Sequence, residues 1–184
     1  MKRQKLSRMV RILIKKFISV CMVVLMLISY GSIAYASTPE EKYADFDILT
    51  PCGYSEEELY SAFDTPYHYR MLPYIDTFLE VEELYGVNAF YLMCKTGLES
   101  GWFKYLSAEN NVGGWRANDG TYMNFESIED CIHHIAYNLS NTYKDHVGTN
   151  LEDVCSMYSP NREYYGYLTN IMVQRENKII ESKA

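Results

Sequence analysis

Helical periodicity on both sides of one glycine-rich segment is the feature that most limits how this chain can fold. Apolar residues recur at the spacing of amphipathic helices over residues 72–85, 88–99, 127–139, 151–157 and 164–180. Between the second and third of these ranges, a run containing Gly113, Gly114 and Gly120 favours loops or a small β-hairpin. We therefore expect a mainly α fold with one Gly-rich β-lobe or loop near residues 106–125.

Local signals predict where several of these helices begin and end. Ser55 with Glu58 forms the pattern of a capping box, which predicts a helix start there. Pro73 suits the first turn of the next helix, and Gly86 suits its left-handed end. Asn88 is typical of the cap of the helix that follows.

The first 36 residues have the pattern of a secretory signal peptide. Basic residues precede an apolar run of 14 residues, and Ala34-Tyr35-Ala36 resembles a cleavage site. The run is shorter than the roughly 20 residues that span a bilayer, although an uncleaved anchor that also uses residues 12–14 is the alternative. We expect contact with the membrane only through this segment, an extended lead-in over residues 37–54, and one catalytic domain over residues 55–184. The protein is then secreted or associated with the cell wall.

The charge of the chain excludes one class of partner. Seven of the 17 basic residues and none of the 24 acidic residues lie in residues 1–36, which leaves a net charge of −14 over the other 148 residues. A nucleic-acid partner requires a basic surface, so none is expected. A sugar polymer would instead be held by aromatic side chains and hydrogen bonds, and tyrosine is abundant.

Cysteine and histidine residues suggest structural roles. Four cysteines lie after residue 36, and in an exported protein an even number indicates two disulfides with open pairing; four buried thiols are the alternative. The cysteines are Cys52, Cys94, Cys131 and Cys155. Adjacent His133 and His134 would point about 100° apart on a helix, so we expect no metal and no cofactor. A peptidase pair of Cys94 with either histidine would require Cys94 to be unpaired and exposed.

Glu99 is the strongest candidate for catalysis. It stands in the run Gly97-Leu98-Glu99-Ser100-Gly101-Trp102-Phe103, at the predicted end of a helix. The negative end of the helix dipole and nearby aromatic rings disfavour the charged form of a carboxyl group. A carboxyl group that keeps its proton can act as the general acid of glycoside cleavage, although an ordinary exposed Glu at a helix end fits the same pattern.

Four ordered motifs support this interpretation by resemblance. They are residues 85–102 with the Glu-Ser-Gly-Trp run, Asn110 to Gly114, residues 122–130, and Tyr158-Ser159-Pro160 followed by Tyr164 and Leu168. Together they resemble the bacterial endo-β-N-acetylglucosaminidases, a family of autolysins and phage-type peptidoglycan hydrolases. The resemblance runs from about residue 56 to residue 173. It implies a lysozyme-like helical fold with a mobile β-lobe, and cleavage of peptidoglycan glycan strands after N-acetylglucosamine with Glu99 as the acid.

The partner of Glu99 in catalysis stays open at this point. The substrate's own acetamido group or a second carboxylate completes hydrolysis, and Glu126, Glu109 and Asp119 are available. Glu126 also fits a simple helix-start acid, and Asp119 a turn residue. The resemblance further implies a late tyrosine near the acid, which by position is Tyr164, with Tyr165 as its rival.

The remaining candidates would bind sugar. Aromatic rings can stack on sugars and asparagine can bond them, and a glycine permits close backbone approach. The candidates are Trp102, Asn110, Asn111, Gly113, Trp115 and Tyr165, with Trp102 equally suited to anchor the core and the asparagines to shape a turn. We expect a monomeric hydrolase; the alternatives are a lytic transglycosylase that uses Glu99 alone and a non-catalytic wall-binding or assembly module.

Overall fold

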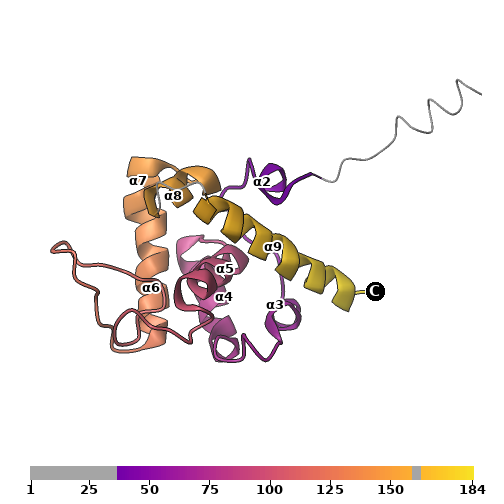
Figure 1. The fold of residues 1–184 in the computed structure, drawn as a ribbon, viewed down its shortest axis with the longest axis horizontal. Helices are drawn as coiled ribbons and strands as arrows, with labels where there is room; N and C mark the ends of the chain where they lie inside the picture. The colour runs from indigo at the N-terminus through magenta and orange to yellow at the C-terminus, as the bar shows by residue number, and fades with distance from the viewer. Residues whose placement is uncertain (1–36, 159–162) are drawn as a thin grey trace, which may run out of the picture. The chain divides into compact units, whose positions relative to one another are not determined.

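The computed structural model describes residues 37–158 and 163–184, and this part of the chain is mainly helical (Figure 1). In chain order the elements are α2 (Pro39–Lys42), α3 (Glu56–Phe63), η1 (Leu72–Tyr74), α4 (Ile75–Tyr85), α5 (Ala89–Ser100), α6 (Ile128–Asn138), η2 (Leu139–Tyr143), α7 (Lys144–Val147), α8 (Leu151–Tyr158) and α9 (Glu163–Ser182). The predicted mainly α fold class is therefore confirmed. The predicted signal peptide lies outside the described residues. None of the helices in the described ranges is long and apolar enough to cross a bilayer.

Side-chain caps set the helix boundaries where the sequence predicted them. Ser55 and Glu58 form a reciprocal capping box at the start of α3. Gly86 ends α4 in the left-handed conformation, with φ of 74°. The Asn88 side chain accepts a 2.8 Å hydrogen bond from the Tyr91 amide and caps α5. The helix predicted from residue 72 begins instead with the 3-10 turn η1, in which Pro73 supplies no amide donor.

Helix α5 is the buried centre of the fold. Ten of its twelve residues are buried, and it packs against α4 and α9, while α6 packs against α4 (Figure 1). The apolar residues Leu92 and Met93 are fully inaccessible to solvent. A side chain at the carboxyl end of α5 is therefore carried by an element whose position is set by core packing on several sides.

The predicted Gly-rich segment is a loop, and a β-lobe is not present in the described residues. Residues 101–127 contain a single isolated antiparallel bridge, between Arg116 and Tyr122. Two backbone hydrogen bonds, Ala117 N to Thr121 O and Met123 N to Trp115 O, flank it. The turn and glycine signals fit loops and hairpins equally well. In the part of the chain that the structure describes, no further strand lies beside residues 115–123, which we call the arm, to extend the pairing into a sheet.

The predicted extended lead-in contains a helical turn and belongs to the core. Residues 37–184 form one compact unit. Thr38 caps α2 through a second capping box, and the Tyr43 hydroxyl donates a 2.8 Å hydrogen bond to Glu176 of α9. Ile48 is fully buried, and its amide donates to the carbonyl of Thr149. Thr38 followed by Pro39 and Glu41 is a helix start, which outweighed the breaker signals of the segment.

The expectation of two disulfides is wrong for this structure, in which all four cysteines are free. Cys94, Cys131 and Cys155 are buried, and burial raises the pKa of their thiols, that of Cys155 to about 12. Buried thiols of this kind pack as small apolar groups. An even count of cysteines in a chain with a signal pattern does not by itself bring their sulfur atoms within bonding distance.

Candidate functional site

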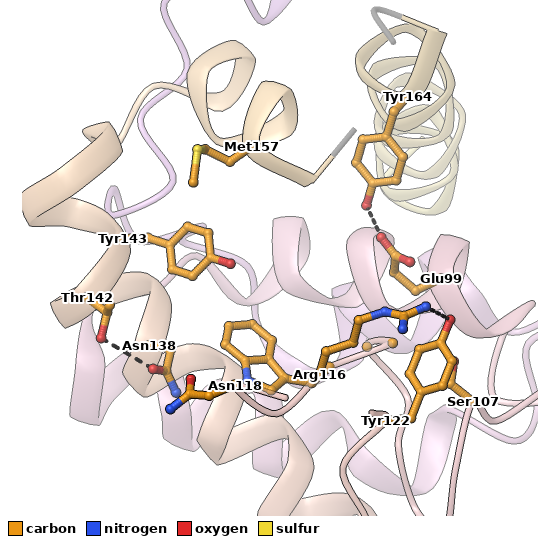
Figure 2. A pocket seen from close by; sticks show the side chains of 13 residues that line it. Glu99, Ser107, Arg116, Asn118, Tyr122, Asn138, Thr142, Tyr143, Met157 and Tyr164 are labelled. Carbon is orange, nitrogen blue, oxygen red and sulfur yellow. Dashed lines mark hydrogen bonds between the residues drawn. The ribbon is translucent and has the colours of Figure 1, made fainter. Parts of the chain in front are cut away.

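A pocket of about 730 Å³ opens at the carboxyl end of α5 (Figure 2). The loop over residues 101–127 forms one wall, and side chains from α6, η2, α8 and the first turn of α9 form the rest. Four of the residues predicted to form the site line this pocket: Glu99, Gly113, Trp115 and Tyr164. Gly114, which follows Gly113 in the loop, lines it as well.

Glu99 presents its carboxyl group to the pocket from the last turn of α5. The Tyr164 hydroxyl donates a 2.6 Å hydrogen bond to Glu99 Oε1, and Figure 2 shows the two side chains pointing toward one another. The other oxygen, Oε2, lies 3.5 Å from the position that a Cβ atom would occupy on Gly114. The Glu99 side chain is 23% exposed, so a ligand in the pocket can reach it.

Lys95 is a buried cation one helical turn before Glu99. Its Nζ lies 3.9 Å from Glu99 Oε1, and its side chain is only 1% exposed. Burial lowers the pKa of Lys95, while the negative charge of Glu99 acts in the opposite direction. Sequence reasoning missed Lys95, although its i,i+4 spacing from Glu99 on an apolar helix was a visible signal.

The Tyr164 phenol is protonated at neutral pH and can donate a hydrogen bond to Glu99. Its burial raises the pKa of the phenol well above 10, and the neighbouring Glu99 raises it further. The hydroxyl therefore keeps its proton and acts as a hydrogen-bond donor. Tyr165, the rival at the adjacent position, is buried and donates instead to the carbonyl of Glu40 at 3.0 Å, so it does not line the pocket.

A left-handed turn directs the chain away from Glu99. Gly101, Trp102 and Phe103 all have φ between 56° and 66°, which costs about 1–2 kcal/mol for each residue other than glycine. The Ser100 hydroxyl stabilises this turn: it accepts the Phe103 amide at 2.9 Å and donates to the Thr96 carbonyl at 2.6 Å.

The turn places Trp102 against the core. Its ring centroid lies 4.0 Å from that of His68 and 5.9 Å from that of Phe63. A Cβ atom on Gly97 would come within 2.3 Å of the indole, so that glycine makes room for it. Trp102 does not line the pocket, and of its two predicted roles the structure shows core packing.

The paired asparagines hold the loop by bonding its backbone. The Asn110 side chain donates to the carbonyls of Phe125 and Glu126 at 2.9 and 3.1 Å. Asn111 is fully buried, donates to the Trp115 and Met123 carbonyls, and accepts the Trp115 amide. Neither asparagine lines the pocket. Their turn-shaping role, one of the two that we predicted, is the one that these contacts support.

Trp115 and Tyr143 form an aromatic wall of the pocket. Their ring centroids lie 5.8 Å apart, and Trp115 also packs edge-on against His134. Gly113 sets the loop close to α6, because a Cβ atom there would lie 2.3 Å from Ile135 Cδ1. In Figure 2, Tyr143 and Met157 lie across the opening from Glu99 and Tyr164.

Arg116 and Tyr122 add a cationic arm that sequence reasoning missed. The Arg116 guanidinium lies 4.0 Å from the centroid of the Tyr122 ring, and it donates to the Tyr122 hydroxyl at 2.7 Å. Both residues line the pocket. Their separation by six positions across an Asn-Asp-Gly turn was the available signal.

Glu99 is the only carboxylate among the pocket-lining residues of the described ranges. Glu126 and Glu109 are exposed and lie outside the lining. Asp119 accepts hydrogen bonds from the amide and hydroxyl of Thr121, which is the turn role that its sequence position allowed. The structure therefore does not bring a second carboxylate to Glu99.

The histidines and Cys94 stand apart from this pocket. His133 Nε2 lies 3.8 Å from Glu80, whereas His134 packs edge-on against Trp115, and neither histidine lines the pocket. Cys94 is unpaired, but it is fully buried rather than exposed as a nucleophile would be. In the residues that the structure describes, no three ligand-type side chains converge as a metal site requires.

Comparison with known proteins does not assign the chain to a family. No protein-family model matches the sequence, and no curated protein is significantly similar to it.

Proposed function

We propose that this protein is a glycoside hydrolase that cuts the glycan backbone of peptidoglycan after N-acetylglucosamine, with Glu99 as the general acid. The observation that carries the proposal is the partly exposed carboxyl group of Glu99, which Tyr164 holds in place and which is the one carboxylate among the described residues that line the pocket. The ordered sequence motifs around Glu99 support the same assignment by their resemblance to endo-β-N-acetylglucosaminidases.

The geometry suits proton transfer from Glu99 to a glycosidic oxygen. Oε1 accepts the Tyr164 hydrogen bond, whereas Oε2 lies near Gly114, where the backbone leaves space. Oε2 is thus the atom that would carry the proton and deliver it to the leaving sugar. Loss of this proton leaves a carboxylate, which the Tyr164 hydroxyl and the nearby Lys95 ammonium would stabilise.

The substrate itself supplies the second group in this mechanism. The carbonyl oxygen of the 2-acetamido group attacks the anomeric carbon as the glycosidic bond breaks and Glu99 protonates the departing oxygen. Water then opens the resulting oxazolinium ring and returns a proton to Glu99. This route needs one protein carboxylate, which agrees with the placement of Glu126, Glu109 and Asp119 outside the pocket lining.

The rest of the pocket suits a sugar chain. Its volume of about 730 Å³ falls within the usual range of ligand sites. Trp115 and Tyr143 offer apolar faces, while Asn118, Asn138 and Thr142 offer amide and hydroxyl groups at the same opening. This combination supports glycan strands as the partner. The same proposal includes two expectations from the sequence: the helices have a lysozyme-like arrangement, and residues 1–36 act as a signal peptide for export.

A lytic transglycosylase is the second candidate, and the single carboxylate of the pocket favours it equally. Such an enzyme also needs one acid, but an internal hydroxyl of the sugar replaces water and an anhydro sugar forms. The two candidates therefore differ in product rather than in the residue that donates the proton.

Digestion of purified peptidoglycan tests the proposal. We expect the parent protein to release fragments with N-acetylglucosamine at the reducing end, identified by mass spectrometry after reduction. Glu99→Gln should abolish release, because a side-chain amide is too weak an acid to protonate the leaving oxygen, whereas the control Glu126→Gln should retain activity. Anhydro-muramic ends would instead establish the transglycosylase. Equal activity of Glu99→Gln and the parent, or an inactive parent, would overturn the assignment of Glu99.

A further inference from the structure

The arm that carries Arg116 presents a positive charge to a pocket in a strongly acidic protein. Arg116 is the only lysine or arginine among the pocket-lining residues described, and its side chain is exposed. The chain after residue 36 has a net charge of −14. Among the lining residues that the structure describes, this cation is thus a local exception to the charge of the protein.

The guanidinium is held in place from two sides. Nη1 donates to the Gly120 carbonyl and Nη2 to the Tyr122 hydroxyl, each at 2.7 Å. The guanidinium also stacks on the Tyr122 ring at 4.0 Å from its centroid. Such a side chain has already lost most of its rotamer freedom, so a ligand would not have to order it.

Most of the donor capacity of Arg116 stays available. A guanidinium has five N–H donors, and the two hydrogen bonds to the arm use two of them. Within residues 37–158 and 163–184, no carboxylate forms an ion pair with Arg116. The remaining donors and the positive charge match the geometry of a carboxylate, which arginine binds through paired hydrogen bonds.

We propose that Arg116, in the pocket where Glu99 acts, binds the free lactyl carboxylate of a muramic acid residue from which the stem peptide has been removed, because in a peptide-bearing residue this carboxyl group is part of an amide bond. This inference rests on the proposed function, because it names the chemical group beside the bond that Glu99 cleaves. Arg116 then makes the site prefer an anionic glycan over a neutral polymer of N-acetylglucosamine. Tyr122 acts as a positioning residue that holds the guanidinium.

Binding to a matched pair of ligands tests Arg116 apart from turnover. The ligands are a tetrasaccharide of alternating N-acetylglucosamine and N-acetylmuramic acid with free lactyl carboxylates, and the methyl ester of the same compound. Calorimetry on the Glu99→Gln protein, which does not cut them, should show about tenfold weaker binding of the ester. With Arg116→Gln added, the acid and the ester should bind equally.

Three further experiments test the specificity of this result. Arg70→Gln is the matched control, because Arg70 also stacks on a tyrosine and bonds its hydroxyl but lies outside the pocket lining; it should leave the preference unchanged. Tyr122→Phe should reduce the preference while keeping the ring. A tetrasaccharide whose lactyl groups carry a dipeptide distinguishes a lactyl carboxylate from a peptide carboxylate. If the methyl ester of this dipeptide compound binds more weakly than its free acid, and Arg116→Gln removes the difference, Arg116 binds the stem peptide and the assignment to the lactyl group is overturned.

The outcomes separate this inference from the proposed function. A preference for the acid that persists in Arg116→Gln, no preference in the Arg116 protein, or no binding of any ligand would overturn the role of Arg116. If the preference depends on Arg116 but the protein with Glu99 intact cleaves nothing, the carboxylate site stands and the hydrolase assignment falls. If the parent cleaves peptidoglycan but the acid and the ester bind equally well, the hydrolase assignment stands and the role of Arg116 falls.

Discussion

The phenol of Tyr164, in the first turn of α9, donates a 2.6 Å hydrogen bond to Oε1 of Glu99 at the end of α5. The two residues are 65 positions apart in the sequence. Their contact ties the orientation of the carboxyl group to the packing of α9 on α5. One oxygen of Glu99 is thereby occupied, which leaves the other for a ligand.

Removing this hydrogen bond should slow turnover without unfolding the protein. In Tyr164→Phe the ring stays and the donor is lost, so the carboxyl group is less well oriented and its charged form less stabilised. A hydrogen bond to a charged group contributes about 1.5–3 kcal/mol, so we expect kcat to fall by roughly 10- to 100-fold. The measurement is the initial rate on purified peptidoglycan.

Tyr165→Phe is the matched control for this prediction. It deletes the neighbouring hydroxyl, which bonds the Glu40 carbonyl rather than Glu99. We expect a small loss of stability and an unchanged kcat. If both variants lose activity equally, the effect comes from disturbance of α9 and not from the contact with Glu99.

Replacing Lys95 with methionine should lower kcat. Lys95 Nζ lies 3.9 Å from Glu99 Oε1, and a positive charge there stabilises the carboxylate that forms when Glu99 transfers its proton to the substrate. In Lys95→Met this stabilisation is lost, so kcat on purified peptidoglycan should fall by roughly tenfold or more. An apolar side chain of similar length also removes the cost of burying a cation, so the free energy of unfolding should not fall.

Lys104→Met controls for the loss of one positive charge. Lys104 is exposed and lies over the Tyr105 ring. This variant should leave kcat unchanged. A kcat that stays the same in Lys95→Met would contradict the electrostatic role of Lys95.

The stability of the protein should depend on His68 in mild acid. Burial and the nearby Arg175 lower the pKa of His68 from 6.5 to about 4. The unfolded chain then binds more protons than the folded one between these pH values, so the free energy of unfolding falls as the pH decreases through that window. Urea unfolding at several pH values should show a flatter dependence for His68→Gln and no change for His146→Gln, at an exposed site. Parallel curves for His68→Gln and the parent would contradict this assignment.

The parts of the fold set by local interactions were predictable from the sequence. Ser55, Gly86 and Asn88 end or begin helices through contacts with residues at most four positions away. The position of Glu99 at the end of α5 and of Gly113 in the following loop rests on the same kind of signal. Short-range hydrogen bonds and backbone preferences depend on residues that are close together in the sequence, so sequence patterns predict them.

The features that depend on tertiary packing were not predictable in the same way. Lys95 is buried only because α5 is enclosed by other helices, and a lysine in a helix is ordinarily exposed. The pairing of cysteines depends on distances between elements, which an even count does not supply. The direction of Trp102 follows from a left-handed turn in which it and Phe103 have positive φ, a conformation that neither residue type favours.

The two tryptophans should have different roles, Trp102 in the stability of the fold and Trp115 in substrate binding. Trp102→Ala removes an indole that packs on Phe63 and His68, and we expect the free energy of unfolding to fall by about 3 kcal/mol. Trp115→Ala instead removes the pocket's aromatic wall beside Tyr143, so KM for peptidoglycan should rise while unfolding changes less. Chemical unfolding and initial rates on the same preparations measure both effects. A higher KM in Trp102→Ala at a temperature where it is fully folded would return Trp102 to the binding site, because loss of core packing alone does not change the affinity of the folded protein.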